Sequence, residues 1–186
     1  MAKKNKAFRF RIYPNKSQEE LFARTFGCCR FIYNRMLSDK IDRYRQDKTM
    51  LRTTPASYKK EFPWLKEVDS LALCNVQLNL EKAYKNFFAR PETGFPKFKS
   101  KHHSAASYTT NFVNGNIRIE NGRLRLPKAG NVKIVCHREI PSEWKMKSVT
   151  IRREPTGKYY ASILCECEAV ENQDSFALPE EKNILG

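Results

Sequence analysis

The chain has 186 residues, of which 40% are hydrophobic and 12% aromatic, and its formal net charge at pH 7 is +15. This composition excludes a disordered tail and allows one large domain or two small ones, each with a core. No run of about 18 apolar residues occurs, and the start "MAKKNKAFRF" lacks a signal-peptide core, so we expect no membrane segment and a cytoplasmic protein. The six cysteines are then expected to be reduced thiols.

The first predicted elements are a strand and a long helix. Residues 8–13, "FRFRIY", alternate apolar and polar side chains, which is typical of a strand with one buried face. Pro14 ends this strand. The tetrapeptide Ser17-Gln18-Glu19-Glu20 has the pattern of a capping box, and apolar residues at a 3.6-residue period predict a helix that runs to about Arg45.

A second helix is predicted from Asp69 to about Phe88, after a broken polar stretch at residues 47–66. We expect the two helices to form an antiparallel pair. Short side chains occupy the outer side of the first two turns of the second helix: Ser70, Cys74 and Asn75. Helix N-termini that enter a DNA major groove place such groups against base edges, although simple exposure and capping would give the same pattern.

From Gly94 onward the period changes from 3.6 to 2. The segment "GFPKFKSK" reads as an extended basic linker, and several alternating segments follow it. Asn121-Gly122 between two of them predicts a type I′ hairpin. With one strand before the helices and five or six after them, the predicted class is α+β. The simplest architecture is a β-barrel with a helical unit inserted after its first strand.

The basic charge is unevenly distributed along the chain. Residues 1–110 hold 23 Lys/Arg and 10 Asp/Glu, whereas residues 161–186 hold 1 and 6. Neutralising phosphates releases counterions, so such a chain favours nucleic acid, with an acidic protein or a membrane surface as alternatives. The candidate phosphate-binding cations, whose alternative is a merely solvated face, are Arg9, Arg11, Lys97, Lys99, Lys101, Arg118, Arg123, Arg125, Lys128, Arg152 and Arg153.

No catalytic or metal constellation is recognisable in the sequence. There is no CxxC pair, no phosphate-binding glycine loop and no group of carboxylates embedded in apolar strands. Cys165 and Cys167 share one face of a predicted strand and are expected to pack in the core. We therefore predict no catalytic residue, no metal site and no cofactor in this chain.

Several segments, in this order, resemble the N-terminal half of TnpB (OrfB), the transposon-encoded RNA-guided DNA nuclease related in plan to miniature type V CRISPR effectors. They are "KAFRFRIYPNKSQEELFARTFGCCRFIYNRML", "WLKEVDSLALCNVQLNLEKAYKNFF", "GFPKFKSK", "YTTNFVNGNIRIENGRLRLPKAGNVK" and "KYYASILCECE". The resemblance implies an OB-like wedge barrel formed by residues 1–15 and 94–170. It further implies an inserted helical recognition domain at 16–93, and an acidic linker leading to a truncated RuvC-like domain at 171–186.

The resemblance also implies partners and residue roles. The partners are a guide RNA of the omega type, which the chain would require, and double-stranded target DNA with an adjacent motif. The residues that fall at motif-reading positions of the family are Thr53, Ser57, Ser70, Cys74, Asn75, Tyr108, Thr110, Val113 and Asn114. Cleavage in the family uses metal ions held by a RuvC-like, RNase H-fold domain, so Mg²⁺ is expected only there.

The function expected for the chain is therefore guide-RNA binding and DNA-motif recognition without cleavage. The end "KNILG", residues 182–186, resembles the first nuclease strand just before its first catalytic Asp. The alternatives are a nuclease-free, RNA-guided transcriptional regulator and a generic basic RNA-binding protein. The resemblance implies the cytoplasm of a bacterium or archaeon, with nucleoid association when the protein is on DNA.

Overall fold

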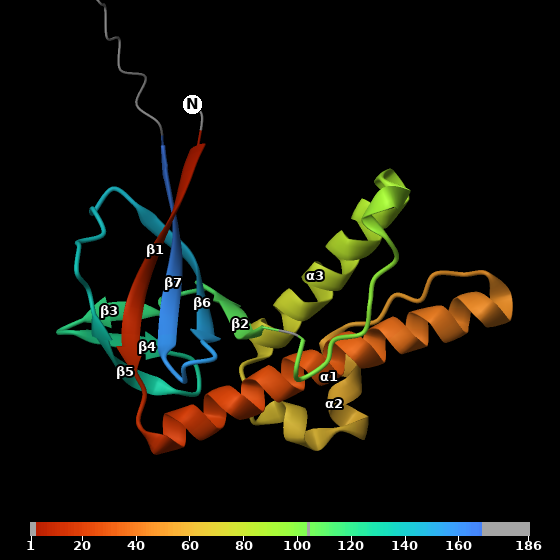
Figure 1. Cartoon of the computed structure of the whole chain (residues 1–186), viewed down its shortest axis with the longest axis horizontal. Coiled ribbons are helices and arrows are strands. Elements are labelled where there is room, and N and C mark those ends of the chain that lie inside the picture. Colours follow the sequence, from red (N-terminus) through yellow and green to blue (C-terminus); the bar gives the residue numbers. More distant parts are fainter. Residues whose placement is uncertain (1–2, 104, 169–186) are drawn as a thin grey trace, which may run out of the picture.

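The computed structural model describes residues 3–103 and 105–168, which form a curled sheet with helices against one end (Figure 1). The strands are β1 (Lys3–Tyr13), β2 (Ala106–Asn111), β3 (Arg118–Glu120), β4 (Arg123–Leu126), β5 (Gly130–Val135), β6 (Lys145–Arg153) and β7 (Tyr159–Glu168). The helices are α1 (Lys16–Asp47), α2 (Pro55–Glu61) and α3 (Ser70–Ala89), with 3-10 turns η1 (Pro63–Lys66) and η2 (Pro91–Thr93). The predicted α+β class is confirmed, while the segment assigned to a truncated nuclease domain, 171–186, lies outside the described residues.

The sheet is antiparallel throughout and has the strand order β2-β6-β7-β1-β5-β4-β3. It curls in the manner of a barrel (Figure 1), but in the described residues its edge strands β2 and β3 are not paired with each other. The predicted barrel is therefore an open half-barrel. The predicted type I′ hairpin joins β3 to β4, with positive φ at Asn121 (50°) and Gly122 (67°).

The start of the chain folds as its alternation predicts, with one correction at the helix cap. Phe8, Phe10 and Ile12 of β1 are buried on the inner face of the sheet. The cap of α1 is Asn15, two residues before the predicted position. Its side chain accepts a hydrogen bond from Gln18 N (2.9 Å), and Gln18 Oε1 accepts one from Asn15 N (3.0 Å). Asn is an efficient N-cap, so the helix begins as soon as Pro14 has ended the strand.

The prediction of an antiparallel helix pair is wrong. Cys29, near the middle of α1, contacts Ala72 at the start of α3, and Tyr44, near the end of α1, lines the same pocket as Phe88 at the end of α3. The two helices thus run in the same general direction and cross obliquely (Figure 1). Residues 48–69 allow this arrangement because they return the chain along α1 through α2 and η1, a stretch predicted to be only broken and polar.

Sheet and helices share one hydrophobic core. Phe22 of α1 is fully buried, and its ring lies 6.1 Å from that of Tyr108 on β2 and 5.9 Å from that of Tyr159 on β7. The buried residues of the helices and of the sheet form one continuous cluster. The helices at 16–93 therefore share their core with the strands. That they form a separate recognition domain stays a prediction.

Candidate nucleic-acid interface

The outer face of the sheet, opposite the buried side chains, carries a dense set of cations. Strand pairing places them as neighbours: Arg118 opposite Arg125, Arg123 opposite Lys133, and Arg11 and Arg152 both beside Tyr160. Like charges directly opposite one another destabilise a sheet, and although Glu120, opposite Arg123 and 3.7 Å from Arg118, offsets part of this repulsion, the excess of cations favours an anionic ligand. The cations of this outer face are Arg9, Arg11, Arg118, Arg123, Arg125, Lys133 and Arg152.

Two tyrosines lie between the arginines of the outer face. The guanidinium of Arg9 lies 4.1 Å from the ring centroid of Tyr160, and that of Arg11 lies 5.2 Å from the same ring and 5.1 Å from that of Tyr13. Glu154 neutralises part of the charge through Arg9 (2.7 Å) and Arg152 (3.5 Å). The buried Nη1 of Arg11 has no hydrogen-bond partner among the described residues. The tyrosine rings and Glu154 thus hold the arginines in place, and the Arg9 and Arg152 side chains, each 53% exposed, remain open to solvent.

The sequence predicts six of the seven outer-face cations and, through the alternation of residues 8–13, places Tyr13 on the face of Arg9 and Arg11, but Lys133 and Tyr160 were not predicted as members of this surface. The alternation of β5, with Val132 and Ile134 buried, would have revealed Lys133. The remaining predicted cations lie elsewhere. Lys128 is in the β4–β5 turn, Arg153 packs beside Tyr159, and the linker lysines Lys97, Lys99 and Lys101 belong to a segment that forms no strand.

A second candidate surface is a cleft of about 280 Å³ between α1, α3 and the edge strand β2, here called the cleft. Arg30 and Lys99 line it together with Asn75 and Asn79 from α3 and the polar side chains of Ser107 and Thr109 from β2. Arg30, Asn79, Ser107 and Thr109 were not predicted as site residues. For Ser107 and Thr109 the signal was the alternation of β2, whose odd-numbered side chains face away from the core, whereas Arg30 and Asn79 lie on helices and had no such signal.

The predicted reader helix does border the cleft, but its side chains are partly engaged. Asn75 Nδ2 donates to Leu71 O and Thr109 O (both 3.0 Å) and lies 3.2 Å from Asn111 Oδ1. It therefore ties α3 to the edge of the sheet. Ser70 Oγ accepts from Lys59 Nζ at 2.7 Å, whereas Cys74 is exposed. Among the described residues, the side chains of Ser70 and Asn75 are thus held by hydrogen bonds, and no such bond is seen for Cys74.

On β2 the residues predicted to read the motif, Tyr108 and Thr110, are not the ones whose side chains are accessible. Thr110 has no exposed surface and Tyr108 only 7%, because both point into the core. Neither side chain can touch a base edge while the strand keeps this register. Ser107, Thr109 and Asn111 face the opposite way and are partly exposed, and Val113 and Asn114 follow in an exposed turn.

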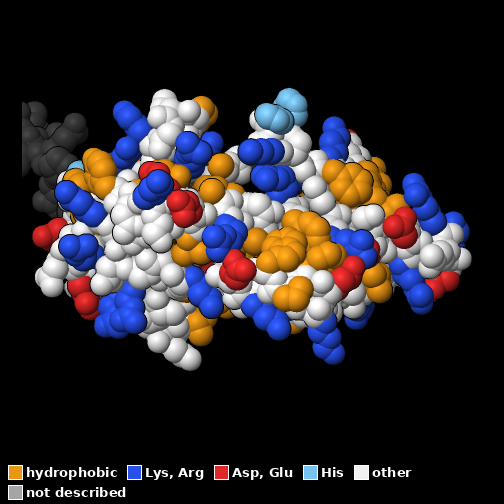
Figure 2. Space-filling view, turned by 90° about the horizontal axis from the view of Figure 1, so that it is seen from below, with side chains coloured by type: hydrophobic (Ala, Val, Ile, Leu, Met, Phe, Trp, Pro, Cys, Tyr) orange, Lys and Arg blue, Asp and Glu red, His pale blue; other side chains and the backbone are white. Residues whose placement is uncertain are grey.

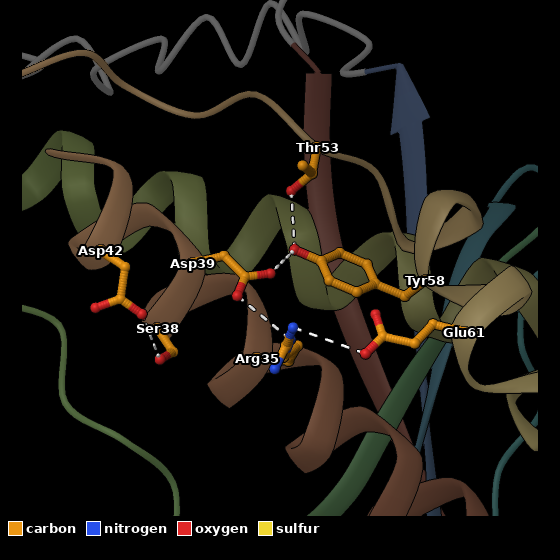
Figure 3. A network of polar contacts seen from close by, with 7 residues as sticks. All are labelled: Arg35, Ser38, Asp39, Asp42, Thr53, Tyr58 and Glu61. Atoms are coloured by element: carbon orange, nitrogen blue, oxygen red, sulfur yellow. Dashed lines mark hydrogen bonds and ion pairs between the residues drawn. The ribbon is translucent and has the colours of Figure 1, made fainter. Parts of the chain in front are cut away.

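Of the predicted residues Thr53 and Ser57, only Thr53 belongs to a polar network that attaches α2 to α1 (Figure 3). The Tyr58 hydroxyl donates to Asp39 Oδ2 at 2.7 Å, so the Thr53 hydroxyl, 3.2 Å away, donates to Tyr58. Arg35 bridges Asp39 (3.3 Å) and Glu61 (3.8 Å). Burial raises the pKa of Tyr58 to about 12, so the phenol keeps its proton at neutral pH. Ser57 is exposed and donates to Thr54 O.

Asn34 holds the linker that supplies Lys99 to the cleft. Its amide accepts from Lys99 N (2.7 Å) and donates to Lys99 O (2.8 Å), which places the Lys99 ammonium 4.1 Å from the ring centroid of Tyr33. Burial lowers the pKa of Lys99, with a smaller opposing effect from Cys29. The clamp therefore fixes a partly desolvated cation at the cleft, where an anion would interact with it strongly.

Replacing Asn34 by Ala should lower the free energy of unfolding by about 1–2 kcal/mol, because two backbone groups lose their partner in a half-buried place. Urea titration measures this difference. Asn86→Ala, an exposed change on α3, is the matched control and should shift the free energy by less than about 0.5 kcal/mol. Equal stabilities of the two variants would show that the clamp does not fix the linker.

The described residues offer no metal centre. Among residues 3–103 and 105–168, no three His, Cys, Asp or Glu side chains come close enough to hold an ion. Within these ranges, a divalent metal of the kind used for phosphodiester cleavage has no ligand set. None of the helices in these same ranges is both long and apolar enough to cross a membrane.

Comparison with known proteins adds a family relationship. Residues 1–49 match the OrfB/IS605 model described as a helix-turn-helix domain, although the structure shows a strand followed by one continuous helix there. The chain is 30% identical over 174 residues to a putative RNA-guided DNA endonuclease of Streptomyces pristinaespiralis. It is 33% identical over 173 residues to the putative RNA-guided DNA endonuclease InsQ of Escherichia coli K12. Both matches cover 89% of this chain and 42% of the relative.

A shorter relative matches part of the chain. Virulence protein VsdF of Salmonella dublin is 33% identical over 106 residues, which cover 49% of this chain and 89% of that protein. The chain thus spans about two fifths of the length of the two endonuclease relatives and nearly the whole length of the third.

Proposed function

Because the chain belongs to the TnpB/OrfB family, we propose that it binds the guide RNA and recognises a DNA motif next to the target in an RNA-guided DNA endonuclease. The partners in this proposal are an omega-type guide RNA and double-stranded DNA. The observation that carries it is the outer face of the sheet, where seven cations come from five of six consecutive strands, with β7 between β6 and β1 contributing Tyr160.

The outer face suits an RNA backbone. Phosphate contacts by Arg and Lys supply affinity without reading sequence, and stacked arginines lose little side-chain freedom on binding. The Glu154 carboxylate offsets part of the repulsion between Arg9 and Arg152, and both arginine side chains stay about half exposed, at 53% each. These features support a backbone-binding role for the half-barrel.

The cleft suits a short stretch of duplex DNA. It combines two cations, Arg30 and Lys99, with short polar groups from α3 and β2 that can donate to or accept from base edges. Sequence recognition beyond the motif would come from pairing between guide RNA and target strand, which the protein holds through its backbone. Ser107 and Thr109 in the cleft, together with Cys74, which is exposed on α3 outside the cleft lining, are the groups that would read the motif.

The experiment uses RNA that co-purifies with the 186-residue chain. After this RNA is sequenced, duplex DNA containing its complement beside randomised positions is incubated with the complex and Mg²⁺. We expect the retained DNA to require the complement and to share a short motif, and to remain uncut. Cleavage above a no-protein control would contradict the binding-only role of this chain. Retention that ignores the RNA sequence would identify a generic RNA-binding protein instead.

A further inference from the structure

An aromatic groove lies at the ends of α1 and α3, away from the cleft. It has a volume of about 390 Å³ and contains Tyr44 and Met50 from the end of α1 and the following loop. The rings of Tyr84, Phe87, Phe88 and Phe95 complete it. Phe88 is 65% exposed, Tyr44 50% and Phe95 44%, so large apolar rings face solvent where no role has been assigned to them.

The rings of the groove support one another. Tyr84 stacks on Phe88 at 6.1 Å and meets Phe95 edge-on at 5.5 Å, and Phe87 meets Phe95 edge-on at 5.4 Å. Because Tyr84 is only 7% exposed, it anchors the exposed rings of Phe88 and Phe95 from beneath. The groove therefore presents flat aromatic surfaces whose positions are already held in the unbound chain.

The charges around the groove indicate which kind of ligand it binds. Its lining contains Lys40 and Arg45 and no carboxylate, and the Lys48 ammonium lies 5.3 Å from the ring centroid of Tyr44. The surrounding segments 40–52, 81–92 and 94–101 hold eleven Lys/Arg against four Asp/Glu. Lys and Arg side chains are spread along the whole length of the face shown in Figure 2, so the basic character of the molecule is not confined to one segment. Such a rim repels a second copy of this +15 chain and attracts a polyanion.

We propose that the aromatic groove binds unpaired nucleobases of a single-stranded nucleic acid, with bases stacked on Phe88 and Phe95 and phosphates beside the rim cations. This inference rests on the proposed function, since it names a second contact for the same class of partner. Stacking tolerates any base because every base has a flat face, so the groove would hold a strand without reading it.

The test measures fluorescence anisotropy of a 12-nucleotide oligoadenylate RNA with the 186-residue chain. Phe88→Ala should weaken binding by about tenfold, as expected for loss of one stacked base, and Phe88→Trp should retain it. An otherwise identical strand with abasic sites should bind wild type and Phe88→Ala equally. The matched control is Leu78→Ala, because Leu78 is 53% exposed on the same helix and lies outside the groove.

Two results would overturn the inference. In the first, Phe88→Ala binds oligoadenylate as tightly as wild type, whereas Arg9→Ala binds it more weakly. The proposed function would then stand, but the groove would have no part in RNA binding. In the second, wild type sediments as a self-associated species, and Phe88→Ala sediments as a monomer with unchanged RNA affinity. The groove would then be a contact between two copies of the chain. Wild-type chain that binds no RNA at all would instead contradict the proposed function itself.

Discussion

Replacing both Arg9 and Arg11 by Ala should weaken RNA binding by roughly 50-fold at about 0.1 M salt, because each lost phosphate contact removes about 0.7–0.9 units of log–log salt slope. The slope should flatten by about 1.4–1.8 units when affinity is followed across a salt series. The two residues lie on neighbouring positions of the outer face and share the ring of Tyr160, so they address the same stretch of backbone.

The control for this variant keeps the same change in net charge. Arg24→Ala with Lys66→Ala removes two exposed cations from α1 and η1, away from the outer face of the sheet. Its slope should stay within about 0.3 units of wild type, since long-range charge alone contributes little beyond a Debye length. If both double variants flatten the slope equally, RNA binding follows total charge, and the outer face is not a defined site.

Replacing Phe22 by Ala should lower the free energy of unfolding by about 3–5 kcal/mol, through lost burial and the cavity left behind. Phe22 is fully buried between helix and sheet, where its ring meets those of Tyr108 and Tyr159. Native domains have total stabilities of about 5–15 kcal/mol, so the variant would approach the limit of folding. Urea unfolding followed by circular dichroism gives the difference.

Two further variants make this stability test specific. Phe22→Leu keeps most of the buried volume and should cost less than about 1.5 kcal/mol. Phe98→Ala removes a ring of the same size that is 58% exposed, so its effect should stay below about 1 kcal/mol. A loss in Phe98→Ala as large as that in Phe22→Ala would mean that the helix–sheet contact is not the centre of the core.

Predictions that depend only on residues close together in the sequence were mostly confirmed. The alternation of residues 8–13 predicts which side of β1 is buried, and Asn121-Gly122 predicts the hairpin with its two positive φ angles. Both depend on neighbours a few residues away. The predicted cap failed by two residues because Asn15 and Ser17 are both good caps, and only the end of the preceding strand favours the first.

Predictions failed where the deciding contact is with a residue far away in the sequence. The register of β2 against β6 decides that Thr110 is buried and Thr109 is partly exposed, and neither side chain differs chemically from the other. Likewise, Asn75 was predicted to reach outward, but the carbonyl of Thr109 lies within hydrogen-bonding distance only in the folded chain.

The class of elements and the six arginines of the outer face can be predicted from the sequence, because period, turn chemistry and charge are properties of short segments, and the resemblance of whole segments indicated the family. Only the tertiary structure decided that these arginines form one surface, that α1 and α3 run in the same direction, and that four aromatic residues from α3 and the following linker meet in one groove. The physical reason is that strand order and helix crossing are set by burial of the shared core around Phe22, which joins residues far apart in the chain.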